Sequence, residues 1–235
     1  MKRAYGGADL AIQLSRFNPP DGEALGALRT VTLPYGIADT AGDVKQHSGT
    51  APLKLLYVGH LGESKGVLDL LQACHLLLQE GLDFQLDLLG KAQPLDFEQT
   101  IRETIVALDL DHKVFLRGEC MGDDKWQYFR NADIFCFPSF YEMETFGIVV
   151  LEAMQFGVPV VGTRWRGIQD VISDGETGFL VDIRSPAQMA QRIQQLAEDE
   201  MLRGKLGGNA RRIFLERYSL QRWIKAMEDL FCPQL

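Results

Sequence analysis

The sequence predicts an α/β fold: a doubly wound parallel sheet with helices on both faces. From residue 53 onward, short apolar runs alternate with longer segments whose apolar residues recur at helical spacing. The short runs are apolar at almost every position, which is typical of strands that are buried on both faces of a parallel sheet. Since most of these runs end at glycine or proline, we expect each strand to end in a turn.

The expected elements alternate along the chain until the last strand, after which only helices follow. The expected strands are residues 54–59, 84–90, 113–118, 133–138, 158–163 and 178–181. The expected helices are residues 66–80, 97–108, 123–131, 145–156, 166–173, 186–199, 201–217 and 219–231. In the first of them, Val67, Leu70 and Cys74 share one face. Because crossovers between parallel strands are right-handed, the sheet is expected to be Rossmann-like, with ligands beyond the carboxyl ends of its strands.

The first fifty residues differ in character from the rest. They contain one short strand pattern, over residues 29–33, and residues 38–52 are typical of a linker. Too few apolar residues precede residue 50 to form a core of their own. We therefore expect three parts: residues 1–50, a Rossmann-like domain over 51–217, and a final helix within 218–235.

Composition and charge exclude several classes of protein. The chain has 235 residues with 24 basic and 32 acidic side chains, and the net charge of −8 is unsuited to a dedicated nucleic-acid binder. No apolar stretch reaches the roughly 20 residues of a membrane span, and the start is not a convincing signal peptide. The four cysteines form no CxxC pair and the histidines form no cluster, so no metal site is expected. Buried, reduced thiols are typical of a cytoplasmic protein.

Common phosphate and catalytic motifs are absent from the sequence. There is no GxxxxGK[ST] motif for a P-loop and no GxGxxG motif after the first strand for a dinucleotide. Neither GxSxG nor HExxH occurs. The function must therefore be sought in other segments, because this fold class hosts many chemistries.

The turn after the first expected strand is one candidate for phosphate binding. It reads GHLGESKG and contains Gly59, His60 and Lys65 before the first helix. Glycine amides, a helix N-terminus and a lysine charge together suit an anion. The alternative is an ordinary surface turn with a solvated lysine, and the two interpretations are about equally supported by this segment alone.

The segment that contains Glu152 is more informative. Glu152 lies inside the apolar expected helix 145–156, where an unpaired carboxylate is costly. One interpretation is a structural ion pair, with an arginine from the C-terminal helices as the partner. The other is a binding role, in which the carboxylate accepts hydrogen bonds from two ligand hydroxyls.

Glu144 lies eight residues before Glu152. On a continuous helix the two carboxylates would stand about 12 Å apart, which spans a diphosphate with a sugar on each side. The helix N-terminus between them would offer free backbone amides to the phosphates. Those amides belong to Thr145, Phe146, Gly147 and Ile148. The pattern predicts a site for a nucleotide-diphosphate-sugar.

At these residues the chain resembles the nucleotide-binding half of retaining GT-B glycosyltransferases of family four, the group 1 glycosyltransferases. The family pattern GRLxxxKG is similar to GHLGESKG over residues 59–66, and the family's E-x7-E signature is similar to Glu144–Glu152. The stretches VFLRG, NADIFCFPS and DGETGFLVD also resemble the family's usual succession. The resemblance covers roughly residues 31–230 and implies one GT-B half domain with extra C-terminal helices.

The resemblance implies a role for each candidate residue. Lys65 and Glu144 would be the catalytic pair: Lys65 would contact the donor diphosphate, and Glu144 would hold the transferred sugar. Glu152 would hold the ribose, and the base would lie near residues 117–119. The other donor-binding residues would be Gly59, His60, Thr145, Phe146, Gly147 and Ile148. No cofactor or metal is implied, since the nucleotide-sugar is itself the donor substrate of a hexosyltransferase-type reaction.

The chain departs from the family in two ways. His60 stands where the family has arginine, and imidazole lacks the permanent, bidentate charge of a guanidinium. Only a tail of the family's amino-terminal domain is expected within residues 1–50, and the last helix would normally cross back to that domain. The resemblance therefore implies a carboxy-terminal half that needs an amino-terminal GT-B domain as its partner.

Three functions remain open at this point. The first is a glycosyltransferase that acts on a carbohydrate, lipid-linked or other acceptor. The second is a non-catalytic nucleotide-sugar-binding module or subunit, and the third, less favoured by the E-x7-E segment, is a GT-B epimerase. Residues 203–225 hold seven basic side chains against one acidic one, which favours a solvated helix face. The alternative is peripheral attachment of a cytoplasmic protein to the inner membrane face.

Overall fold

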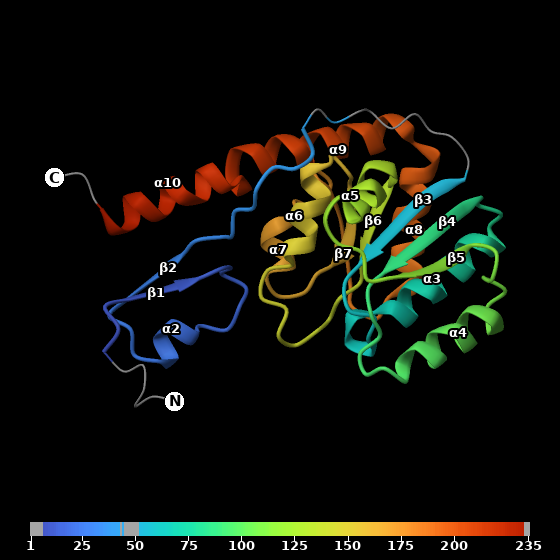
Figure 1. Ribbon diagram of the computed structural model, residues 1–235, viewed down its shortest axis with the longest axis horizontal. Coiled ribbons are helices and arrows are strands. Elements are labelled where there is room, and N and C mark those ends of the chain that lie inside the picture. The colour runs from blue at the N-terminus through green and yellow to red at the C-terminus, as the bar shows by residue number, and fades with distance from the viewer. Residues whose placement is uncertain (1–6, 43, 45–51, 233–235) are drawn as a thin grey trace.

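A six-stranded parallel sheet forms the centre of the molecule, and the expected doubly wound α/β fold is confirmed (Figure 1). The structure is a computed structural model and describes residues 7–42, 44 and 52–232. The strands are β3 (Leu53–Val58), β4 (Phe84–Leu89), β5 (Val114–Gly118), β6 (Ile134–Phe137), β7 (Val160–Thr163) and β8 (Gly178–Val181). Their order is β5-β4-β3-β6-β7-β8, so the chain reverses its direction of winding between β3 and β6. In such sheets ligands bind at this switch point.

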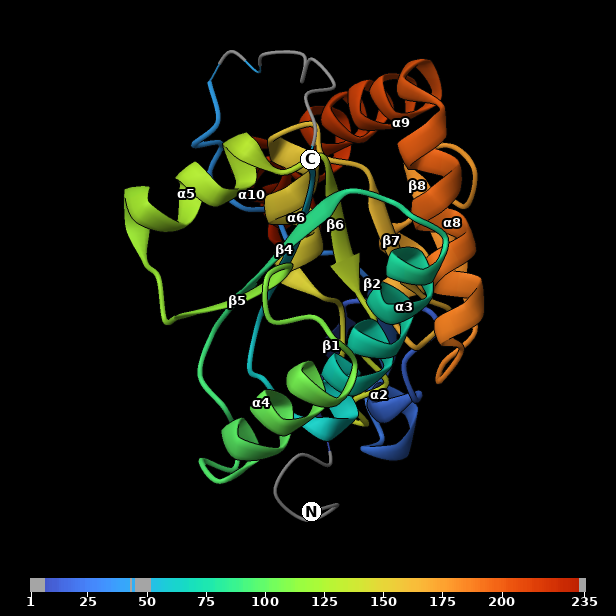
Figure 2. The same cartoon turned by 90° about the vertical axis from the view of Figure 1, so that its right-hand side faces the viewer.

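Helices cover both faces of the sheet (Figure 2). The first face carries α3 (Val67–Gln79), α4 (Phe97–Ala107) and α8 (Pro186–Glu198). The second carries α5 (Gly122–Asn131), α6 (Ile148–Gln155) and α7 (Ile168–Val171). After α8 come α9 (Glu200–Ile213), a π-helical turn η2 (Phe214–Tyr218) and α10 (Leu220–Phe231).

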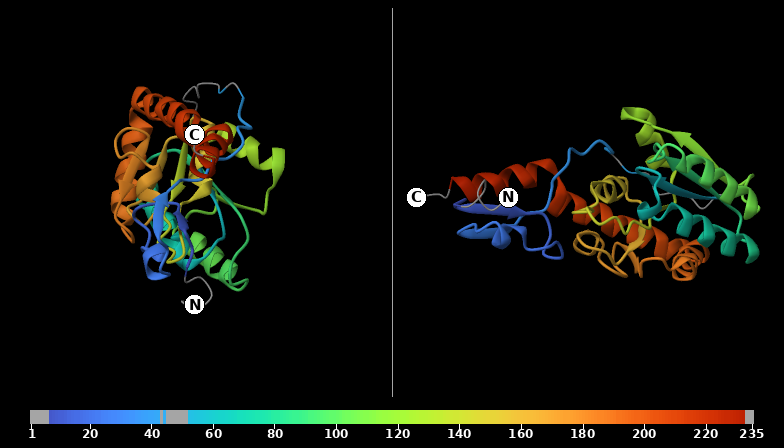
Figure 3. Two further views of the ribbon diagram at one scale, coloured as in Figure 1. Left: turned by 90° about the vertical axis from the view of Figure 1, so that its left-hand side faces the viewer. Right: turned by 90° about the horizontal axis from the view of Figure 1, so that it is seen from below.

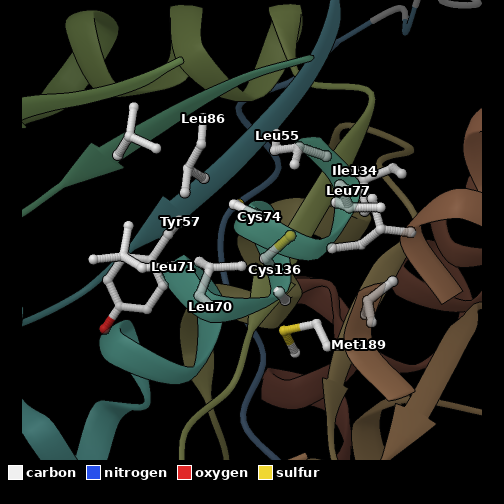
Figure 4. Close-up of a cluster of buried hydrophobic side chains, with 14 of the residues drawn as sticks. Leu55, Tyr57, Leu70, Leu71, Cys74, Leu77, Leu86, Ile134, Cys136 and Met189 are labelled. Atoms are coloured by element: carbon white, nitrogen blue, oxygen red, sulfur yellow. The ribbon is translucent and has the colours of Figure 1, made fainter. Parts of the chain in front are cut away.

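The alternation of side chains in β3 explains why the sheet is buried on both sides. Leu55 and Tyr57 point into the cluster formed with Leu70 and Cys74 of α3, which Figure 4 shows. Leu56, between them, points to the opposite face and belongs to the second cluster. All of these side chains are at most 1% exposed. Burial of apolar side chains on both faces is the main force that holds the sheet and its helices together.

Before the sheet, the chain forms a small lobe of its own. It consists of β1 (Leu10–Gln13), the short α2 (Asp21–Ala24) and β2 (Arg29–Thr32), and its two strands pair in parallel. β2 was predicted from the sequence, whereas β1 was missed because its three apolar residues are too short a run to show a strand period. The lobe and α10, blue and red in Figure 3, project together from the sheet and its helices.

The two chain segments that connect the lobe and α10 to the sheet domain meet at Ile37. The Ile37 amide donates to the Tyr218 carbonyl (2.9 Å), and the Leu220 amide donates to the Ile37 carbonyl (2.8 Å). A Cβ atom on Gly36 would lie 2.8 Å from the Ser219 carbonyl oxygen, so only glycine allows this approach. Further along, the Gln155 side chain accepts from the Thr40 amide (2.9 Å) and hydroxyl (3.0 Å).

Asp39 makes this junction sensitive to pH. The Arg211 guanidinium donates to both carboxylate oxygens at 2.8 Å and lowers the pKa of Asp39 below its usual value. A pair of this kind stabilises the fold above the unfolded-state pKa, and the stabilisation is lost as the pH falls through the lowered folded-state pKa. We expect the difference in unfolding free energy between the native protein and Asp39→Asn to be largest at about pH 7, to shrink as the pH falls below about 4, and to vanish once the pH is below the lowered folded-state pKa of Asp39. Urea titrations at several pH values measure it, and a difference that persists at the acid end would contradict the assignment.

Several predicted elements differ from the observed ones at their ends. The expected helix 145–156 begins only at Ile148, because Gly147 adopts a left-handed conformation (φ 75°) that interrupts the helix. The helix expected over residues 166–173 is observed as the shorter α7. In the helix expected over residues 201–217, the α-helical conformation ends at Ile213. Cys74 and Cys136 are buried as expected, with pKa values raised by burial. Cys120 is partly exposed and Cys232 is exposed, so the expectation of buried thiols is wrong for these two.

The basic stretch 203–225 is not simply a solvated helix face. Arg203 is only 5% exposed and donates to the Leu196 carbonyl at the end of α8 (2.6 Å). Arg211 is bound to Asp39, and Arg212 forms ion pairs with Glu176 and Glu216. A large part of this positive charge is therefore neutralised within the fold.

Candidate functional site

A cavity of about 350 Å³ opens at the switch point, at the carboxyl ends of β3 and β6. It lies between the turn after β3, the loop after β6 and the first turns of α6. The residues that line it are Tyr35, Tyr57, Val58, Gly59, Lys65, Phe137, Glu144, Thr145, Phe146, Gly147, Ile148, Val149 and Glu152. All the predicted donor-binding residues except His60 are in this set, so the fold brings together segments that are far apart in the sequence.

Lys65 and Glu144 form an ion pair inside this cavity. The Lys65 Nζ atom lies 2.7 Å from Glu144 Oε2, and the two side chains are 19% and 13% exposed. The Ser139 hydroxyl donates to the same oxygen (3.1 Å), and Lys65 Nζ lies 4.4 Å from the centre of the Tyr141 ring. The ammonium group is thus fixed in place, with one carboxylate and one aromatic face as partners.

Gly66 allows Lys65 to reach this position. Lys65 ends the 3-10 turn η1 (Glu63–Lys65), and Gly66 connects it to α3 in a left-handed conformation (φ 74°). A Cβ atom on Gly66 would lie 2.2 Å from the Pro138 carbonyl oxygen, which no side chain tolerates. The glycine therefore lets the turn after β3 pack against the end of β6.

Glu152 has a partner that the sequence did not indicate. Its Oε1 atom accepts from Lys125 Nζ of α5 at 2.7 Å, and the two side chains are 15% and 19% exposed. Lys125 also lies over the Trp126 ring, at 4.2 Å from its centre. The structural interpretation of Glu152 is thus correct in kind, but its partner is a lysine from α5 rather than an arginine from the C-terminal helices. Since Glu152 also lines the cavity, the ion pair does not exclude a binding role.

The segment between the two glutamates is a turn followed by a helix. Because α6 begins at Ile148, the two carboxylates are not on one helix, and the 12 Å spacing along a helix axis is wrong. The first amides of α6 have no partner within the helix and border the cavity. Phe146 is 1% exposed and packs edge-on against Tyr35 and Tyr218, which anchors the turn.

Two tyrosines of the cavity were missed by sequence reasoning. Tyr57 is fully buried in β3, where it reads as an ordinary core residue. Its hydroxyl donates to the His60 carbonyl (2.7 Å), and burial, with a smaller contribution from the Glu144 charge, raises its pKa. Tyr35 comes from the segment that follows β2, and no local signal indicates that this segment returns to the site.

Two other candidate segments lie outside the cavity lining. The His60 side chain is exposed, and the residue takes part in the site through its backbone carbonyl. Residues 117–119 are exposed at the end of β5, where Arg117 is paired with Asp87 (2.6 Å). Within the described residues, His, Cys, Asp and Glu form no group of three that could hold a metal ion. No helix of this part of the chain has both the length and the apolar character that crossing a membrane requires.

The fold defines a class: a GT-B, Rossmann-like half domain, here with a cavity at the switch point of its sheet. A family model described as "Glycosyl transferases group 1" matches residues 43–213. The chain belongs to this family of glycosyltransferases.

Relatives in sequence are named as glycosyltransferases. The chain is 30% identical over 176 residues to a capsular polysaccharide biosynthesis glycosyltransferase, CapM, of Staphylococcus aureus, covering 74% of this chain and 44% of CapM. It is 35% identical over 156 residues to a D-inositol 3-phosphate glycosyltransferase of Arthrobacter sp. (strain FB24), covering 65% of this chain and 36% of the relative. The chain thus spans less than half the length of these relatives.

Solved structures share the fold at lower sequence identity. Sucrose-phosphate synthase from Thermosynechococcus elongatus superposes with a TM-score of 0.84 at 23% identity, over 98% of this chain and 59% of that one. The C-terminal domain of a group 1 family protein, LpcC, from Francisella tularensis superposes with a TM-score of 0.70 at 23% identity, over 79% of this chain and 100% of that one. Anabaena Alr3699/HepE, in complex with UDP and glucose, superposes with a TM-score of 0.79 at 21% identity, over 95% of this chain and 63% of that one.

Proposed function

We propose that this chain is the donor-binding half of a retaining, hexosyltransferase-type glycosyltransferase, which moves a sugar from a nucleotide-diphosphate-sugar to an acceptor. The observation that carries the proposal is that Lys65, Glu144 and Glu152 line one cavity at the switch point of the sheet. One ammonium group, two carboxylates and the amino end of α6 together offer a partner for each polar part of such a donor. The family supports transfer of a sugar in general.

In this proposal Lys65 and the amides at the start of α6 hold the diphosphate. Charge builds up on the departing diphosphate as the bond to the sugar breaks, and fixed donors that face this charge stabilise the transition state. Lys65 already has its ammonium group in the cavity, held by Glu144 and the Tyr141 ring. Its displacement on binding is therefore small, and little reorganisation precedes the chemical step.

The two glutamates have separate tasks. Glu144, at the turn before α6, accepts hydrogen bonds from hydroxyls of the transferred sugar, and Glu152 accepts them from the ribose. Glu152 uses Oε1 for Lys125, which leaves the other carboxylate oxygen for the ligand. Gly59, Thr145, Phe146, Gly147 and Ile148 border the donor through their backbones. His60 contributes at the edge of the site, and no cofactor or metal takes part.

The acceptor side is proposed to need a further domain. Residues 1–50 would be the remnant of an amino-terminal GT-B domain with its linker, residues 51–217 the donor-binding domain, and 218–235 the segment that crosses between them. The alternative is a non-catalytic nucleotide-sugar-binding module or subunit that works with a separate amino-terminal half. We place the protein in the cytoplasm, with attachment to the inner membrane face as the alternative.

The test is to titrate UDP and GDP into the protein by calorimetry, and then to supply the matching nucleotide-sugars with a sugar acceptor. We expect one of the two nucleotides to bind, and transfer to begin only when an amino-terminal half from a relative such as CapM is added. The anomeric configuration of the product, measured by NMR, tests retention. Transfer by the chain alone at about 1–1000 per second would contradict the need for a second half. Failure of both nucleotides to bind would contradict the donor site itself.

A further inference from the structure

Arg166, in the loop between β7 and α7, has a backbone conformation that is unfavourable for arginine. Its φ angle is 40°, in the left-handed region that glycine adopts freely and that long side chains rarely occupy. Such strain is retained only where the surroundings impose it, and it concentrates at sites that bind or react. A glycine at position 166 would adopt this conformation at lower cost, so the arginine side chain needs an explanation of its own.

The Arg166 guanidinium is also incompletely bonded. Its Nε atom is buried, and no acceptor for it is found in the described part of the chain. The guanidinium lies 5.5 Å from the centre of the Trp165 ring, and no ion pair joins it to a carboxylate of the described residues. A buried, unsatisfied donor on a charged group is expensive, and a shift of the side chain that brings the guanidinium onto a bound anion would satisfy it.

The loop that carries Arg166 is packed onto the candidate site. A Cβ atom on Gly167 would lie 2.0 Å from the Thr145 carbonyl oxygen and 3.0 Å from Phe146 Cα, and both of these residues line the cavity. The Trp165 indole donates to the Tyr141 carbonyl (2.9 Å), in the loop that holds Lys65 in place. Arg166 therefore stands beside the rim of the cavity without belonging to its lining.

The amino-terminal lobe meets the sheet domain at the same place. Asn18 Nδ2 donates to the Thr145 carbonyl (2.7 Å), while its Oδ1 atom is buried and lacks a partner in the described part of the chain. Arg16 pairs with Asp170 of α7 (3.1 Å), and its side chain is 74% exposed. A second arginine, already paired with a carboxylate, and a second unsatisfied polar group thus lie close to the loop of Arg166.

From these observations we infer that Arg166 binds an oxyanion group, phosphate or carboxylate, on the acceptor of the transferred sugar. The inference rests on the proposed glycosyl transfer. The donor diphosphate is assigned to Lys65 and the start of α6, inside the cavity, whereas Arg166 lies outside the lining. The planar, permanently charged guanidinium matches the geometry of phosphate and carboxylate. Arg166 would then select charged acceptors over neutral ones.

The experiment compares three probes on the UDP- or GDP-saturated protein by calorimetry: glucose 6-phosphate, glucuronate and glucose. We expect the phosphate or the carboxylate probe, or both, to bind at least about tenfold more tightly than glucose. In Arg166→Gly the charged probes should fall to the level of glucose, with nucleotide affinity unchanged. Because glycine relieves the left-handed strain, the Tm should rise by about 2 °C. Arg166→Lys keeps the positive charge but lacks the paired donors of a guanidinium. It should therefore retain part of the preference for charged probes over glucose.

Arg184 provides a matched control, because it is a second left-handed arginine (φ 53°) whose side chain lies over Phe140 at 4.7 Å. Arg184→Gly should leave the preference for charged probes intact.

Native-like binding of the charged probes by Arg166→Gly, or equal binding of all three probes by the native protein, would overturn the inference. If neither nucleotide binds, the proposed function fails separately, and the probes are then titrated into the free protein and into Lys65→Ala. Anion binding that is lost in Lys65→Ala but kept in Arg166→Gly would also overturn the inference.

Discussion

Replacing Lys65 by alanine should weaken nucleoside diphosphate binding by roughly 10- to 100-fold, or about 1.5–3 kcal/mol, the usual worth of a charge-assisted hydrogen bond. The ammonium group is the positive charge that the cavity offers to a diphosphate, and Glu144 and the Tyr141 ring fix its position. The free nucleoside should bind to the variant as it does to the native protein, since it carries no phosphate. Calorimetric titrations of both ligands measure the difference.

Lys113→Ala is the matched control for this prediction. Lys113 is also paired with a carboxylate, that of Asp83 at 2.6 Å, but it does not line the cavity. Its replacement should leave the affinity for the diphosphate unchanged. Equal losses of nucleoside and nucleoside diphosphate affinity in Lys65→Ala would show that the substitution disturbs the pocket as a whole, and Lys65 would not be a diphosphate ligand.

The second large effect is expected for Glu152→Gln, which should lower ribonucleotide affinity by about 1–3 kcal/mol because the charged acceptor for the ribose hydroxyls is lost. If Glu152 had no partner, this variant would be no less stable than the native protein, since a buried charge disappears. The ion pair with Lys125 reverses that expectation. The Lys125 ammonium, 19% exposed, would be left without its carboxylate, and we expect a loss of about 1 kcal/mol of unfolding free energy.

Lys125→Met separates these two roles of Glu152. It breaks the same ion pair and keeps the apolar stem over Trp126, so its loss of stability should match that of Glu152→Gln. Its nucleotide affinity should stay native, because Lys125 does not line the cavity. A 2′-deoxynucleotide should bind the native protein more weakly than the ribonucleotide, yet bind Glu152→Gln about equally. Native affinity for both nucleotides in Glu152→Gln would leave Glu152 with a structural role only.

Sequence reasoning works well where the signal is local. The sheet was predictable because each strand is a short apolar run with a turn residue behind it, as in residues 54–59. The candidate site was predictable because Lys65 and Glu144 lie in the segments that follow β3 and β6, and Glu152 lies in the helix that comes next, at one edge of the sheet. Residues with these places in a parallel sheet come together whatever the exact loop conformations are.

Partners chosen by tertiary packing gave no such signal. Lys125 looks like any solvated lysine of an amphipathic helix, and only the packing of α5 beside α6 brings it to Glu152. The start of α6 was misplaced because apolar spacing continues through residues 145–147, although Gly147 is a recognisable helix breaker. Tyr35 contributes from a segment that reads as a chain connection, so its place in the cavity depends entirely on the junction at Ile37.

The junction at Ile37 links two segments that are far apart in the sequence. The chain passes between the lobe and the sheet domain before β3 and again after η2, and the two passages are hydrogen-bonded to each other at Ile37 and Tyr218. Because the two passages are bonded to each other, the segment that leads into α10 is attached directly to the segment that carries Tyr35. Tyr35 stands two residues from Ile37 with its ring edge-on to Phe146, and both residues line the cavity. One wall of the cavity is thereby anchored to the start of a helix that itself lies outside the lining.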